Sequence, residues 1–85
     1  MTDSRILAAI EAQPEIWLDA KGMIEDFGPA GAAHEAATAQ GDAIGAGDDE
    51  EAVRWDAIRE AIAALRADAD LMQTVAAFEV SRRRN

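Results

Sequence analysis

The chain has 85 residues, a formal net charge of −9 and no cysteine, so it can form one small domain without disulfide support. Alanine supplies much of its 49% hydrophobic fraction and aromatic residues only 5%, which favours helix formation over a large core. No apolar run approaches the roughly 20 residues of a membrane-spanning helix. We expect a single cytoplasmic all-α domain over residues 1–85, a small bundle of three to four helices with Ala-rich packing faces and no strands.

The acidic residues are concentrated in the first part of the chain. Residues 1–51 hold twelve acidic residues against two basic ones, whereas residues 52–85 hold five acidic residues against six arginines. A negative field repels nucleic acid and anionic membranes and attracts basic protein surfaces. The alternative interpretation is that the acidity only keeps a small protein soluble.

Two helices are expected first, over about residues 3–12 and 14–27. Pro14 suits the first turn of the second helix, where its missing N–H is not needed. A single helix kinked at Pro14 is the alternative. In that case three carboxylates would lie along one side of it: Glu11, Glu15 and Asp19.

A third helix is expected over about residues 29–45, after Gly28 and Pro29 end the second one. This helix is rich in alanine, so neighbouring helices can approach it closely. Gly45 and Gly47 are expected to end it.

The best-defined helix is expected over about residues 48–66. Its larger apolar residues recur at alternating steps of three and four, which is the spacing of one stripe of a helix. They are Trp55, Ile58, Ile62 and Leu65. Asp48 is expected to cap the first turn, and Glu51 can reach back as in a capping box.

A last helix is expected over about residues 70–82, after a short break near residues 67–70. The alternative is a helix that continues without a break from Leu65, because apolar residues extend its stripe. The expected core is built around seven large side chains: Trp17, Ile24, Phe27, Trp55, Ile58, Ile62 and Leu65.

A Gly-Asp pair followed by a Trp-x-x-Ile-x-x-Ala-Ile-x-x-Leu helix is the most distinctive motif of the chain. Its residues are Gly47, Asp48, Trp55, Ile58, Ala61, Ile62 and Leu65. This pattern resembles a family of small uncharacterised helical proteins from alphaproteobacteria and their mobile elements. The resemblance covers roughly residues 16–66, implies an all-helical fold and brings no known activity. Members usually carry basic residues beside the Trp, whereas here Arg54 and Asp56 flank it.

Residues suited to catalysis or metal binding are few. His34 is the only histidine, and no Ser, Thr or Cys is spaced to act with it as a nucleophile. The acidic run of residues 48–51 lacks the alternating oxygen ligands and central glycine of a calcium loop, so we interpret it as helix capping. Glu50 and Arg54 are interpreted as a solvated ion pair one helical turn apart, as are Glu79 and Arg83. We therefore predict no enzymatic activity, no cofactor and no metal.

The remaining feature is a set of carboxylates spread over the first helices, for which the sequence offers few basic partners. They are Glu11, Glu15, Asp19, Glu25, Asp26, Glu35 and Asp42. We predict that they bind a basic protein surface, such as that of a nucleic-acid-binding complex, without direct contact to nucleic acid or a membrane. Small acidic phage inhibitors, including some anti-CRISPR proteins, are similar in size and charge, which makes a nucleic-acid mimic the sharpest form of this hypothesis. The alternative is a structural homodimeric module whose acidity is incidental.

Overall fold

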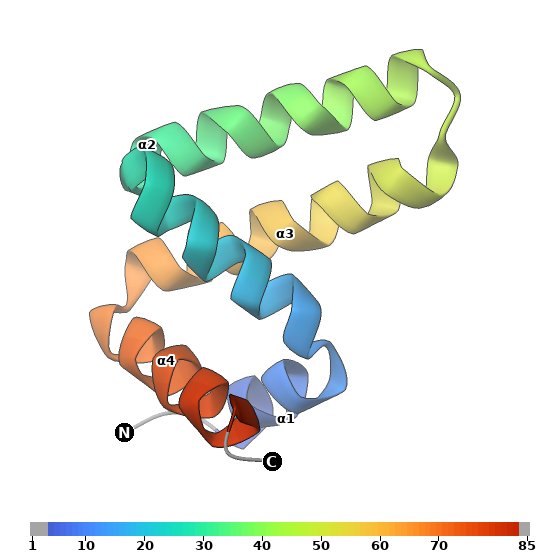
Figure 1. The fold of residues 1–85 in the computed structure, drawn as a ribbon. Helices are drawn as coiled ribbons and strands as arrows, with labels where there is room; N and C mark the ends of the chain where they lie inside the picture. Colours follow the sequence, from blue (N-terminus) through green and yellow to red (C-terminus); the bar gives the residue numbers. More distant parts are fainter. Residues whose placement is uncertain (1–3, 84–85) are drawn as a thin grey trace.

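A computed structural model describes residues 4–83, and within this range the chain forms four helices and no strand. The helices are α1 (Ser4–Ala12), α2 (Pro14–Gly45), α3 (Asp49–Ala67) and α4 (Ala69–Arg83) (Figure 1). The predicted all-α class is confirmed, and the predicted helix limits differ from those observed by a few residues at most, apart from the joining of two predicted helices into α2.

The break between α1 and α2 falls at Gln13. Its backbone angles, φ −138° and ψ 61°, are not helical, and Pro14 occupies the first turn of α2. The two helices predicted around Pro14 are therefore confirmed, and the single kinked helix is excluded. Glu11 therefore lies on a different helix from Glu15 and Asp19.

A sharp bend at Gly28 divides α2 into two halves. Gly28 has φ 77° and ψ 166°, a region that side chains with a Cβ rarely enter, and Pro29 follows it. The halves correspond to the helices predicted over residues 14–27 and 29–45. The second half runs antiparallel to α3, and the two form a helical hairpin that extends away from α1 and α4 (Figure 1).

The turn of the hairpin is closed by backbone bonds and one side-chain cap. Gly47 has φ 75°, and the N–H of Asp48 donates to the carbonyl of Ala43 over 2.9 Å, the pattern of a Schellman motif. The Asp48 carboxylate then accepts from the N–H of Glu51 at 3.2 Å. The predicted cap is confirmed.

The break between α3 and α4 lies at Asp68, whose φ of −141° and ψ of 103° are extended. Its carboxylate accepts from the N–H of Asp70 at 3.0 Å, and its carbonyl accepts from Leu71 at 3.1 Å. The predicted short break is confirmed, and the unbroken helix is wrong.

The core combines large aliphatic side chains with buried alanines, in agreement with the predicted Ala-rich packing faces. Its buried members are Ile10, Ala20, Ala32, Ala36, Ile58, Ala61, Ile62, Leu65, Leu71 and Val75. Trp17, Ile24 and Trp55 are only partly buried and pack against this cluster.

The prediction that Phe27 lies in the core is wrong, because Phe27 is 53% exposed. It is the last residue before the bend at Gly28, and its Cβ lies next to Gly31 in the following turn. The bend turns the chain before the apolar stripe of the first half of α2 can carry Phe27 into the core.

Candidate docking surface

Three of the seven predicted partner-binding carboxylates form ion pairs with basic residues of this chain. Glu15 accepts from Arg82 of α4 at 3.0 Å. Asp19 pairs with Arg54 of α3. Both contacts join the first half of α2 to a different helix, so these carboxylates help to hold the bundle together. The expectation that the acids of the first helices lack basic partners is wrong for them.

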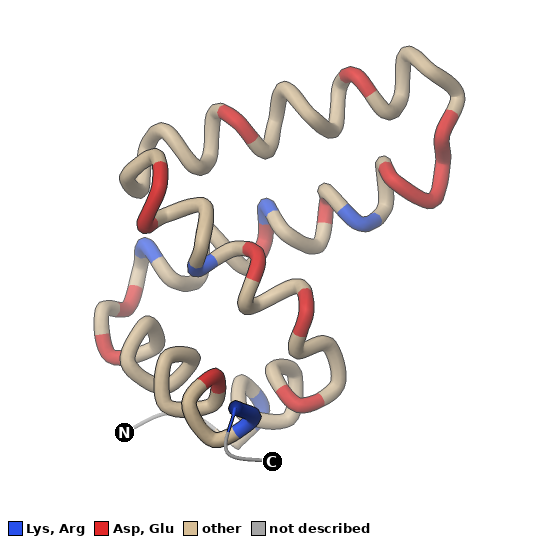
Figure 2. The backbone as a smooth tube through the Cα atoms, in the orientation of Figure 1, with Lys and Arg blue, Asp and Glu red and all other residues tan. Residues whose placement is uncertain are grey.

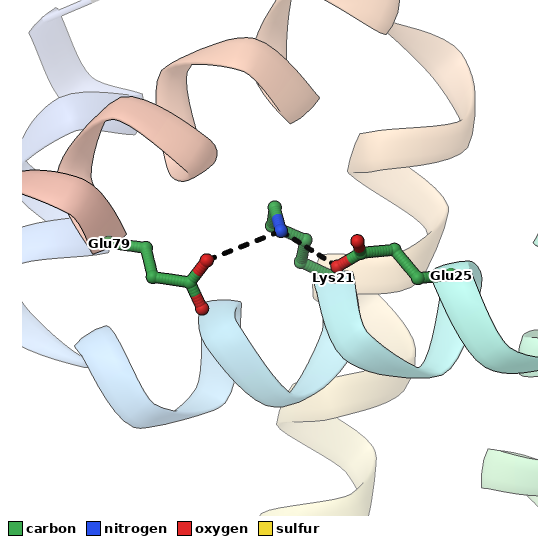
Figure 3. Close-up of polar contacts among 3 residues, drawn as sticks. All are labelled: Lys21, Glu25 and Glu79. Carbon is green, nitrogen blue, oxygen red and sulfur yellow. Dashed lines mark hydrogen bonds and ion pairs between the residues drawn. The ribbon is translucent and has the colours of Figure 1, made fainter.

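The third pair centres on Lys21, which contacts two carboxylates (Figure 3). Its Nζ lies 2.7 Å from Glu25 Oε1, one turn along α2, and 3.4 Å from Glu79 Oε1 on α4. The hydrogen bond to Glu25 raises the pKa of Lys21 above its ordinary value of 10.5, with further support from Glu79 and against the opposing effect of burial. Only 12% of the Lys21 side chain is exposed. The ammonium thus links α2 to α4 in its charged form.

The predicted ion pairs within single helices are replaced by these contacts between helices. Arg54 pairs with Asp19 in place of Glu50, and Glu79 pairs with Lys21 in place of Arg83. An exposed pair one turn apart contributes only about 0.3–0.5 kcal/mol, so a better-placed carboxylate on a neighbouring helix easily displaces it.

The other four predicted carboxylates are exposed, and none of them is in an ion pair within residues 4–83. They are Glu11, Asp26, Glu35 and Asp42. Glu35 and Asp42 are seven residues apart on the second half of α2, which places them on one side at a separation of about 10 Å along the axis. Glu11 lies on α1 and Asp26 beside the bend. The four therefore do not form one continuous patch.

A denser acidic surface lies at the turn of the hairpin, and we call residues 42–51 the acidic tip. Its five carboxylates have no basic residue between them in the sequence (Figure 2). They are Asp42, Asp48, Asp49, Glu50 and Glu51. Across residues 4–83, no ion pair involves any of these five.

Arg54 is the nearest basic residue to the acidic tip in the sequence, and its position explains why the tip is not neutralised. Its guanidinium is bound to Asp19 and its Cζ lies 5.7 Å from the centre of the Trp55 ring. Held by these two contacts, Arg54 is directed to the first half of α2. Glu50, one turn before it, is exposed and forms no ion pair within residues 4–83.

One exposed aliphatic side chain lies within the acidic tip and a second lies just after it. Ile44 is 63% exposed and Val53 is 70% exposed, the largest values among the exposed large hydrophobic residues of the described chain. Val53 does not lie on the apolar stripe of α3. A helical wheel drawn from the sequence would have shown that it points away from this stripe. Sequence reasoning missed the tip because it treated residues 48–51 as capping alone, whereas only Asp48 accepts a capping bond there.

Other kinds of site find little support among the described residues. His34 is exposed on the second half of α2. Within residues 4–83, no group of three or more His, Cys, Asp or Glu side chains is arranged to hold a metal ion, and no helix there has the length and apolar character needed to span a membrane. Comparisons with protein-family models, curated proteins and solved structures find no match. The family resemblance of the Trp55 helix stays a prediction.

Proposed function

We propose that the chain is a non-enzymatic interaction protein whose acidic tip binds a basic surface on a partner protein. The observation that carries this proposal is that five carboxylates at one end of the hairpin form no ion pair within residues 4–83. Arg54, the nearest basic residue in the sequence, contacts Asp19 and Trp55. Of the seven carboxylates predicted to bind a partner, Asp42 belongs to this surface.

The composition of the tip is suited to two stages of binding. Unneutralised carboxylates attract a basic surface over a distance of roughly 10 Å at 0.1 M salt, which speeds the encounter. Ile44 and Val53 then offer apolar area that loses contact with water once the partner is in place. A narrow acidic hairpin also fits the basic groove of a nucleic-acid-binding protein, which is the form of the proposal that a phage-type, anti-CRISPR-like inhibitor would take.

A homodimeric structural module is the second candidate, and the exposure of Phe27 is the observation that favours it. Phe27 lies at the bend of α2, away from the turn of the hairpin. Self-association through the acidic tip is disfavoured because it would bring the carboxylates of two copies together. A dimer built on Phe27 would leave the tip free, so the two candidates are separable by mutation.

Neutralising the tip tests the proposal. The tip variant carries Asp49→Asn, Glu50→Gln and Glu51→Gln, and its matched control carries the same loss of charge at exposed positions outside the tip. The control substitutions are Glu11→Gln, Glu35→Gln and Glu60→Gln. We expect immobilised wild-type protein and the control to capture the same basic protein from a lysate of the source organism at 50 mM salt, and the tip variant to lose it.

Two results would contradict this expectation. Equal loss in the tip variant and the control would show that net charge alone is responsible. Capture that survives 0.5 M salt and tip neutralisation but is lost on Phe27→Ser would favour an apolar interface. Circular dichroism of each variant checks that the helices are intact, because loss of acids in the first turn of α3 also weakens their interaction with the helix dipole.

A further inference from the structure

A second feature of the surface is a hollow of about 390 Å³ between the first half of α2 and α3. Its apolar lining consists of Leu18 and Met23 from α2 and Trp55 and Ile58 from α3. Trp55 is only partly buried, and the Arg54 Cζ lies 5.7 Å from the centre of its ring. The hollow is therefore apolar inside and open to solvent.

The hollow owes part of its space to a glycine in the middle of a helix. Gly22 lines it, and a Cβ built on Gly22 would meet no atom within 4 Å. Glycine weakens a helix relative to alanine, and it is usually explained by the close approach of another segment. No such approach exists at Gly22 within the described structure. Its effect here is to leave the hollow open.

The polar rim of the hollow carries one carboxylate in excess. Asp19, Asp26 and Arg54 contribute to it, and Arg54 neutralises Asp19. Asp26 forms no ion pair with any residue between 4 and 83. Asp19 and Asp26 are seven residues apart, so about 10 Å of helix separates the neutralised end of the hollow from the charged end.

We propose that this hollow receives a lysine or arginine side chain of the basic partner, an inference that rests on the proposed function. The methylene groups of the side chain pack against Met23 and Trp55, and its cation lies beside Asp26. Arg54 repels the incoming cation from the Asp19 end, which sets the direction in which the side chain enters. Methionine is flexible and adapts its shape to a long unbranched chain.

The length of the basic side chain is the property that distinguishes this hollow from a merely acidic surface. Octamers of lysine and of 2,4-diaminobutyrate carry the same charge at pH 6.5, but lysine has four methylene groups in its side chain and diaminobutyrate has two. We expect the wild-type protein to bind fluorescein-labelled octalysine roughly tenfold more tightly, as measured by anisotropy, because two more methylene groups are buried.

Two substitutions and one control test the assignment. Gly22→Leu fills the hollow without meeting any atom at its Cβ and removes a helix-weakening glycine, so the fold is retained. Gly22→Leu should abolish the preference for octalysine and leave the affinity for the diaminobutyrate octamer, which has the shorter side chains, unchanged. Asp26→Asn should weaken the binding of octalysine more than Glu35→Gln does, because Glu35 is an exposed carboxylate that does not line the hollow.

The outcomes separate this inference from the proposed function. Equal affinity of both octamers for the wild type, or a preference that survives Gly22→Leu, overturns the hollow as a receptor. In that case, if the tip variant no longer binds either octamer, this result still supports the acidic tip as a surface that binds a basic partner. Failure of the wild type to bind either octamer at 50 mM salt overturns both proposals.

Discussion

Acidic residues have different roles in the acidic tip and at the opposite end of the molecule. In the helical base, formed by α1, residues 14–27 of α2 and α4, carboxylates face cations from another helix: Glu15 faces Arg82, and Glu79 faces Lys21. At the tip, two helix ends and a turn meet, and among residues 4–83 no third helix lies there to supply a cation (Figure 2). Glu15 and Glu79 thus become part of the fold where helices cross, whereas the five carboxylates of the acidic tip, like Glu11 and Asp26 in the base, form no ion pair within residues 4–83.

The comparison extends to apolar residues. Ile58 is fully buried where α3 packs on α2, whereas Val53, five residues earlier in the same helix, is 70% exposed. We therefore expect Val53, next to the acidic tip, to contribute little to the free energy of unfolding, in contrast to Ile58. Three predictions test this division, beginning with the largest expected effect.

Ile58→Ala should lower the free energy of unfolding by about 2–5 kcal/mol, because it removes buried methylene groups and leaves a cavity. Val53→Ala should change it by no more than about 0.5 kcal/mol, as is usual for an exposed side chain. Urea denaturation followed by circular dichroism measures both. Similar losses for the two variants would show that Val53, next to the acidic tip, is as important to the fold as Ile58, where α3 packs on α2.

Lys21→Met should cost about 1–2 kcal/mol, because Glu79 then loses its charged partner at a partly buried position. Since the pKa of Lys21 is raised in the folded protein, its contribution is fully present below pH 10.5 and is lost as the pH rises through the raised value. The difference in stability between wild type and variant should therefore narrow above pH 10.5. A difference that is constant to pH 11.5 would argue that packing of the lysine stem is the cause.

Asp48→Ala should cost about 1 kcal/mol, because the N–H of Glu51 loses its capping acceptor. Glu50→Gln should cost less than about 0.5 kcal/mol, because Glu50 has no ion pair to lose within residues 4–83. Thermal melts with and without added Ca²⁺ measure both changes. A Ca²⁺-dependent stabilisation that only the wild type shows would reveal a metal site at the tip.

The helices and their ends were predictable because the determinants are local. A glycine before a proline at residue 28, an aspartate before three more acids at residue 48 and a break at Asp68 each act on the few peptide groups beside them. Local hydrogen bonds and backbone preferences are the same in a peptide and in a folded protein, so their effect can be derived from neighbouring residues. The apolar stripe of Ile58, Ile62 and Leu65 follows from the helical period in the same way.

The partners of the charged residues were decided only by tertiary structure. By spacing alone Arg54 belongs with Glu50, yet the crossing of α2 over α3 brings Asp19 to it. The centre of the ring of Trp55, the next residue along α3, lies 5.7 Å from the Arg54 Cζ. Exposed ion pairs differ in free energy by less than about 1 kcal/mol, so whichever carboxylate the helix crossing places nearest is selected. The direction in which the bend at Gly28 turns the chain likewise decided that Phe27 lies outside the core. Which carboxylates remain for a partner thus depends on how the helices cross, and the sequence alone does not specify that geometry.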